Sequence, residues 1–116
     1  MRTLTKREVD DICYKHELYL NHDPRGERAD FSDCDLSNLS LINKRLDGAI
    51  FENANLSGCN MDKTDITGCN FAFADLTGVY LHDSNAGECN FKNAILSEAK
   101  LDSVVLFMSD LSGARY

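Results

Sequence analysis

Histidine and cysteine are the residues of this chain best suited to metal binding or nucleophilic catalysis, but their spacing supports neither. The three histidines, His16, His22 and His82, form no HExxH-like motif and have no cysteine at a zinc-site separation. His16 falls on the apolar stripe of a predicted helix, so we interpret it as a packed helix residue. We interpret His82 as a solvated surface residue beside Asp83. We therefore expect no metal site and no cofactor.

Most of the chain follows a five-residue repeat, in which one position is usually filled by a small residue. Four of the five cysteines occupy that position: Cys34, Cys59, Cys69 and Cys89. A buried thiol at such a position behaves as a small hydrophobic side chain. Cys69 and Cys89 are predicted to stack in adjacent layers at a distance that a disulfide would permit, but a reducing cytosol favours free thiols. No secretory signal is visible and no apolar run approaches the roughly 18 residues of a membrane helix, so the sequence predicts a cytoplasmic protein.

No glycine-rich phosphate loop, nucleophile elbow or pair of carboxylates in a pocket can be assigned, so we expect no catalytic residues and no enzyme activity. The chain has 116 residues, enough for one domain. Its net charge of −7 belongs entirely to residues 29–116, because residues 1–28 carry six acidic and six basic side chains. Such an acidic surface argues against direct binding of nucleic acid, which needs lysine and arginine, and leaves room for a basic protein partner.

A five-residue period runs from Ala29 to Tyr116 without interruption. Every fifth residue from Phe31 onward is apolar or aromatic, and the residue two positions earlier is nearly always small. Because side chains two apart in an extended chain share a face, both rows are predicted to point inward. The residue between them points outward, and ten of these eighteen outward residues are Asp or Asn. A strict period of five does not fit an amphipathic helix.

The remaining position of each repeat must break the strand alternation, which predicts a corner. Gly, Asn and Asp, which tolerate positive φ, fill eleven of these seventeen positions. Phenylalanine occurs in the large inward row only at twenty-residue spacing, which predicts a coil with four five-residue sides. The predicted core ladder is Phe31, Phe51, Phe71, Phe91 and Leu111. We expect a solenoid filled in this way to have no cleft.

Ala54-Asn55-Leu56-Ser57-Gly58 and Ala74-Asp75-Leu76-Thr77-Gly78 resemble the consensus of the pentapeptide-repeat family, Ala-(Asp/Asn)-Leu-X-X. The resemblance covers residues 29–116. It implies an all-β solenoid that is a right-handed, four-sided parallel β-helix, and the handedness comes from the resemblance alone. The eighteen repeats correspond to about four and a half coils of this kind.

Residues 1–28 are predicted to form a capping helix and a loop within the same structural domain. Thr5-Lys6-Arg7-Glu8 is a capping box with Thr5 as the N-cap. Apolar residues recur at helical spacing from Val9 onward, which predicts an α-helix from about Lys6 to Leu18 that covers the first coil. A short N-terminal helix is also familiar in the family that the chain resembles. Lys44, at a small inward position of the first coil, is expected either to extend toward an open edge or to pair with an acidic residue of the cap.

The opposite end has no predicted cap, since the chain is still in repeat phase at Tyr116. Val105, Phe107 and Met108 break the polar-outward rule on one side of the last full coil. An uncapped coil beside exposed apolar residues indicates burial against a partner, and the simplest partner is a second copy related by a two-fold axis. We therefore predict a homodimer interface at Val105, Phe107, Met108 and Tyr116. The alternative is a monomer in which Phe107 folds over the open end.

These features predict a non-enzymatic protein-binding or scaffold module of unknown specific role, and outward apolar residues such as Ile50, Phe73, Tyr80 and Ile95 support it. The resemblance implies a bacterial protein and one alternative, because quinolone-resistance members of the family are acidic dimers that bind type II topoisomerases. That alternative is an acidic DNA mimic that binds or inhibits DNA gyrase, although this solenoid is short and its acidic residues form no continuous double row. A third interpretation is a stable fold without an assigned role.

Overall fold

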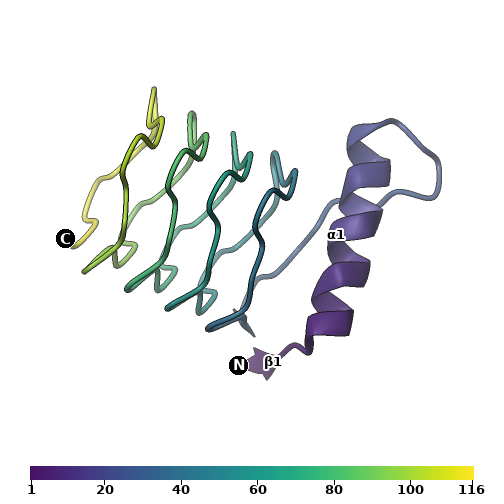
Figure 1. Cartoon of the computed structure of the whole chain (residues 1–116), viewed down its shortest axis with the longest axis horizontal. Helices are drawn as coiled ribbons and strands as arrows, with labels where there is room; N and C mark the ends of the chain where they lie inside the picture. The colour runs from purple at the N-terminus through teal and green to yellow at the C-terminus, as the bar shows by residue number, and fades with distance from the viewer.

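Parallel backbone pairing between residues twenty positions apart builds this molecule. The computed structural model, which describes residues 1–116, contains fourteen isolated parallel bridges, and each joins a residue to the one twenty positions later. The bridged residues are themselves spaced by five along the chain. Twenty residues therefore complete one coil of four five-residue segments, and successive coils stack side by side (Figure 1). The β-solenoid predicted from the sequence is confirmed.

Named strands and helices occur only near the N-terminus. Strand β1 (Arg2–Thr3) pairs in parallel with β2 (Cys34–Asp35), and helix α1 (Lys6–Leu20) lies between them in sequence. The rest of the solenoid forms single bridges because a turn interrupts the extended chain in every five residues. β1 was not predicted, because a two-residue strand is too short to produce a periodic signal of its own.

A left-handed backbone conformation closes each five-residue segment. All seventeen corner residues from Asp33 to Gly113 have positive φ, between 57° and 73°. Five of them are glycine, and the predicted corner at this position is confirmed. The same conformation is imposed on side chains that disfavour it, including Lys63, Phe73 and Met108. The geometry of the coil therefore overrides local preference at these positions.

Aromatic rings stacked from coil to coil run through the core. Phe31, Phe51, Phe71 and Phe91 are at most 1% exposed, and successive ring centroids are 5.1, 4.8 and 5.0 Å apart with nearly parallel planes. Leu111 continues this series but is only half-buried, because no further coil of the described chain packs on it. Burial of the inward residues is therefore complete in the middle coils and decreases toward the C-terminal end.

The outward Asp and Asn residues hold the turns that follow them. At all ten such positions, the side-chain Oδ1 accepts the backbone N–H of the residue two positions later. Thr67 and Thr77 also donate their hydroxyl groups to Asp65 and Asp75, at 2.7 and 2.6 Å. These Asx turns satisfy a backbone donor at each corner, which explains why Asp and Asn dominate the outward row.

Helix α1 lies against the N-terminal end of the solenoid (Figure 1). The predicted capping box is confirmed: Thr5 Oγ1 accepts the Glu8 N–H at 3.2 Å, and Glu8 Oε1 accepts the Thr5 N–H at 3.1 Å. The helix begins at Lys6 as predicted and ends at Leu20, two residues later than predicted. With fifteen residues and many charges, it is too short and too polar to cross a membrane. Its buried residues are Val9, Cys13 and His16.

Candidate protein-interaction surfaces

His16 connects the helix to the solenoid and has no free ring nitrogen. Its Nδ1 accepts the backbone N–H of Ala29 at 2.9 Å, and its Nε2 lies 2.8 Å from the backbone oxygen of Asp47. Because Nδ1 is an acceptor, the proton is on Nε2, which donates to the Asp47 carbonyl. Burial lowers the pKa of His16 and so favours this neutral form. The interpretation of His16 as a packed helix residue is confirmed.

The other two histidines lie nearer the surface. His22 is exposed just after α1. The ring of His82 is partly exposed and lies 3.5 Å from the carboxylate of Asp102 in the next coil. In the structure, no three His, Cys, Asp or Glu side chains lie close enough together to hold a metal ion.

All five cysteines are buried free thiols. The Sγ atoms of Cys69 and Cys89 each donate a hydrogen bond of 2.9 Å to a backbone carbonyl of the preceding coil. Burial raises the pKa of Cys13 and Cys89 to about 11 and that of Cys59 to about 12, and it also raises the pKa of Cys69. Because the thiolate is the reactive form of cysteine, these side chains act as packing residues.

The junction between cap and first coil depends on hydrogen bonds rather than on Lys44. Lys44 is half-buried and forms no salt bridge, so the alternative in which it pairs with an acidic residue of the cap is wrong. Arg28 donates from Nε to the backbone oxygen of Gly48 at 2.5 Å. Asp47 has one buried carboxylate oxygen without a hydrogen-bond partner, and burial raises the pKa of this carboxyl group.

Three apolar side chains project from one side of the last coil. Val105 is 48% exposed, Phe107 72% and Met108 74%. An exposed ring cannot cover the end of the core, so the alternative in which Phe107 folds over the open end is wrong. Tyr116 is also exposed, at 73%. It follows Phe107 by about two of the four five-residue segments of a coil, so it lies on the opposite side of the coil from Phe107 and Met108.

The last coil also presents unpaired backbone groups. One coil earlier, the N–H groups of Leu81, Ala86 and Phe91 donate to carbonyls nineteen positions further on, in the next coil. The equivalent N–H groups of Leu101, Leu106 and Leu111 have no backbone acceptor, and these three side chains are half-buried. This end, which we call the C-terminal end surface, therefore combines exposed apolar side chains with an open β edge, a combination that favours pairing with another chain.

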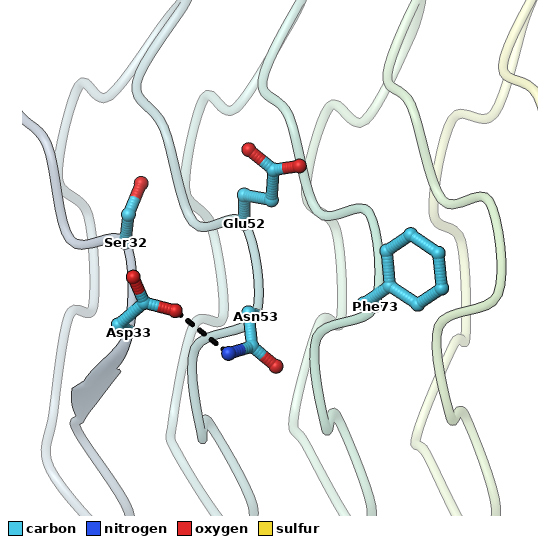
Figure 2. A pocket seen from close by; sticks show the side chains of 5 residues that line it. All are labelled: Ser32, Asp33, Glu52, Asn53 and Phe73. Atoms are coloured by element: carbon cyan, nitrogen blue, oxygen red, sulfur yellow. Dashed lines mark hydrogen bonds between the residues drawn. The ribbon is translucent and has the colours of Figure 1, made fainter. Parts of the chain in front are cut away.

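A cavity of about 320 Å³ lies at one corner of the solenoid (Figure 2). A smaller cavity of about 190 Å³ lies between α1 and the start of the solenoid. The expectation that the solenoid has no cleft is therefore wrong, because packing of the inward residues leaves the outward side chains at the corners free to enclose space. An aromatic residue in the polar corner column, Phe73, was the one sequence signal for this site. The larger cavity, which we call the corner cavity, is lined by Ser32, Asp33, Glu52, Asn53 and Phe73.

Several solved structures have the same architecture. HetL, a pentapeptide repeat protein involved in heterocyst differentiation regulation from the cyanobacterium Nostoc sp. strain PCC 7120, is 27% identical, with a TM-score of 0.74 over 76% of this chain and 43% of its own. Rfr23 from the cyanobacterium Cyanothece 51142 is 29% identical, with a TM-score of 0.55 over 75% of this chain and 63% of its own. The protein alr5209 from Nostoc PCC 7120 is 25% identical, with a TM-score of 0.53 over 88% and 92% of the two chains.

The chain spans less than half the length of HetL and less than two thirds of that of Rfr23. No curated protein matches its sequence. The family described as pentapeptide repeats matches residues 29–68 and 74–115, as eight copies of its repeat. This match covers most of the chain and coincides with the coils of the structure, so the chain belongs to the pentapeptide-repeat family.

Proposed function

We propose that this protein is a non-enzymatic protein-binding or scaffold module that self-associates through its C-terminal end surface. The observation that carries the proposal is the coincidence of three exposed apolar side chains, Val105, Phe107 and Met108, with unpaired backbone N–H groups on the same coil. Exposed apolar patches and open β edges are both features that partners cover. A second copy is the simplest occupant, because a two-fold axis would pair each end with an identical one. Tyr116 contributes to the same interface from the opposite side of the coil.

The size of the end predicts a dimer of limited stability. The molecule measures 38 × 28 × 20 Å, and its long axis follows the stack of coils, so the end covers on the order of 560 Å² per copy. Two copies would bury about 1,100 Å² in total, which is just above the roughly 1,000 Å² that a specific interface needs. We therefore expect the dimer to dissociate on dilution.

Sedimentation of the full chain over a range of concentrations tests this proposal. The wild type should move from the monomer mass of 13.0 kDa toward twice that value as concentration rises. Phe107→Asp should remain monomeric, because it places a charge in the apolar patch. Ile42→Asp is the matched control, since Ile42 is also an exposed apolar residue but lies in the first coil. A wild type that stays at 13.0 kDa throughout would rule the dimer out.

Further properties of the chain are part of the same proposal. Residues 1–28 serve as a cap and loop, and residues 29–116 form the binding solenoid, within one structural domain. We infer that the solenoid is right-handed, as the family resemblance implies, and that its eighteen five-residue repeats make about four and a half coils. We place the protein in a bacterial cytoplasm, which is consistent with its five free thiols and with cyanobacterial relatives.

The DNA-mimic alternative has less support from the positions of the acidic residues. Five of the aspartates belong to the outward row, where each accepts backbone hydrogen bonds within its own turn. Their abundance is therefore explained by turn formation. Asn occupies the other five turn positions of that row, so the negative charges do not follow one another regularly along the solenoid.

A further inference from the structure

The corner cavity joins side chains from three successive coils. Ser32 and Asp33 come from the first coil, Glu52 and Asn53 from the second and Phe73 from the third, and Figure 2 shows them in that order along the solenoid. The volume of about 320 Å³ is at the lower limit for ligand pockets in proteins. It is suited to one side chain of a partner or a ligand of similar size.

Phe73 is an unusual residue for its position. Its ring is 60% exposed and so contributes little to the core, while its backbone is held at φ = 61°. The other residues of the same corner column are Asp33, Asn53, Asn93 and Gly113, which are polar or lack a side chain. A bulky side chain is disfavoured at positive φ. Packing and turn geometry therefore leave the presence of an aromatic ring here unexplained, whereas a ring at the wall of a cavity offers a flat surface to a ligand.

The two carboxylates that line the corner cavity, those of Asp33 and Glu52, have no basic partner. The carboxylate of Glu52 forms neither a hydrogen bond nor a salt bridge, and the carboxylate of Asp33 accepts one hydrogen bond, from Asn53 Nδ2 at 2.7 Å (Figure 2). The basic residue of this corner, Lys92, lies one coil beyond Phe73 and is 3.7 Å from the carboxylate of Asp110. Two carboxylates and an aromatic face thus line one cavity without a cation.

We propose that the corner cavity binds an arginine side chain of a partner protein, with the guanidinium group stacked on the ring of Phe73 and paired with the carboxylate of Glu52 in the adjacent coil. Arginine fits better than lysine because its planar group stacks on aromatic rings and donates several hydrogen bonds at once to carboxylates. The acidic surface of the chain, with a net charge of −7, attracts a basic partner to this site. This inference deepens the protein-binding role proposed above, but it does not depend on the C-terminal end surface.

An NMR titration of the 15N-labelled full chain tests the proposal directly. The probe is the peptide acetyl-Gly-Arg-Gly-amide, with the lysine and citrulline peptides as matched ligands. The arginine peptide should produce saturable shifts centred on the amides of Glu52, Asn53 and Phe73, with a dissociation constant in the millimolar range, as expected for a single side chain. The lysine peptide should bind more weakly, and the uncharged citrulline peptide at least about tenfold more weakly.

Phe73→Asn separates binding from folding. Asparagine is the most frequent non-glycine residue in the corner column and tolerates positive φ, so this variant should unfold at the same or a higher urea concentration. Its affinity for the arginine peptide should nevertheless fall at least about fivefold, and Glu52→Gln should have a similar effect. Met108→Asn also replaces a large apolar residue by asparagine at a positive-φ corner, but far from the cavity, and should bind the arginine peptide as the wild type does.

Three results would overturn the arginine site: unchanged binding by Phe73→Asn, equal binding of the lysine and arginine peptides, or shifts that do not saturate. The monomeric variant Phe107→Asp keeps this experiment independent of self-association. If Phe107→Asp binds the peptide normally, the corner cavity acts on its own, whatever sedimentation shows about the dimer. Loss of peptide binding in Phe107→Asp would contradict the separate site proposed here.

Discussion

The Nδ1 atom of His16 accepts the backbone N–H of Ala29, at a distance of 2.9 Å, and so links the middle of α1 to the first residue of the repeat. Ala29 is 1% exposed and His16 is fully buried, so water cannot replace this bond. A protonated imidazole would place an N–H group against the N–H of Ala29. This contact between the cap and the solenoid therefore requires a neutral His16.

This contact predicts that the protein loses stability in mild acid. Burial lowers the folded-state pKa of His16 from its ordinary value of 6.5, so below about pH 6.5 the unfolded chain binds a proton that the folded chain does not. The contribution of His16 is therefore complete above pH 6.5 and is lost as the pH falls toward the folded-state pKa. Urea unfolding measured from pH 8 to pH 5 should show this decline.

Two variants identify the residue responsible. His16→Gln should lower the free energy of unfolding at pH 8 and reduce its dependence on pH. His82→Gln should retain the wild-type decline, because the ring of His82 is partly exposed. Asp47 acts with the opposite sign, since its raised pKa favours the folded state as pH falls. A wild-type decline that persists in His16→Gln would assign the effect to another group.

The phenylalanine stack should dominate the stability of the middle coils. Phe71 is fully buried between Phe51 and Phe91, with ring centroids 4.8 and 5.0 Å away. Phe71→Ala should lower the free energy of unfolding by about 3–5 kcal/mol, because it leaves a cavity that a closely packed coil cannot fill. Phe73→Asn, two residues away but exposed, should change it by no more than about 0.5 kcal/mol. Equal losses in the two variants would contradict this distinction between inward and corner positions.

Each Asx turn should contribute measurably to the free energy of unfolding. The Oδ1 atom of Asn70 accepts the N–H of Ala72 at 2.9 Å, and Ala72 is 6% exposed. Asn70→Ala should reduce the free energy of unfolding by about 1–3 kcal/mol, because it leaves a buried backbone donor unpaired. Asn70→Asp retains the acceptor and should lose less. Chemical denaturation of both variants at neutral pH provides the comparison.

The thiols should be unreactive while the protein is folded. Burial raises the pKa of Cys59 to about 12 and that of Cys13 to about 11, which leaves almost no thiolate at pH 8. A thiol reagent such as DTNB should label no more than a small fraction of the five cysteines in buffer and all of them in concentrated urea. Rapid labelling of the folded protein would show that the core opens easily at the cysteine positions.

DNA gyrase offers a direct test of the mimicry alternative. We expect no inhibition of supercoiling by micromolar concentrations of this protein, because its aspartates are distributed according to the needs of turns. If some inhibition appears but is lost when salt is added, it reflects a weak electrostatic effect, because salt screens such interactions. Inhibition that depends on protein concentration and resists salt would support mimicry over the protein-binding role.

The five-residue sequence pattern determined which residues lie inside the solenoid and which form corners. The twenty-residue spacing of Phe31, Phe51, Phe71 and Phe91 determined the length of a coil, because residues that stack must recur once per turn. The capping box at Thr5 and Glu8 located the start of α1, because its hydrogen bonds join residues only three positions apart. Each of these inferences relies on contacts that repeat along the chain or span only a few residues.

Tertiary structure decided the features that depend on side chains distant in sequence. The two hydrogen bonds of His16, the pairing of β1 with Cys34–Asp35 and the absence of a salt bridge at Lys44 all involve the junction of the cap with the first coil. The corner cavity likewise needs Asp33, Glu52 and Phe73 to come together from three coils. A repeat pattern specifies the average position of a residue, whereas a site depends on the individual side chains that stacking brings side by side.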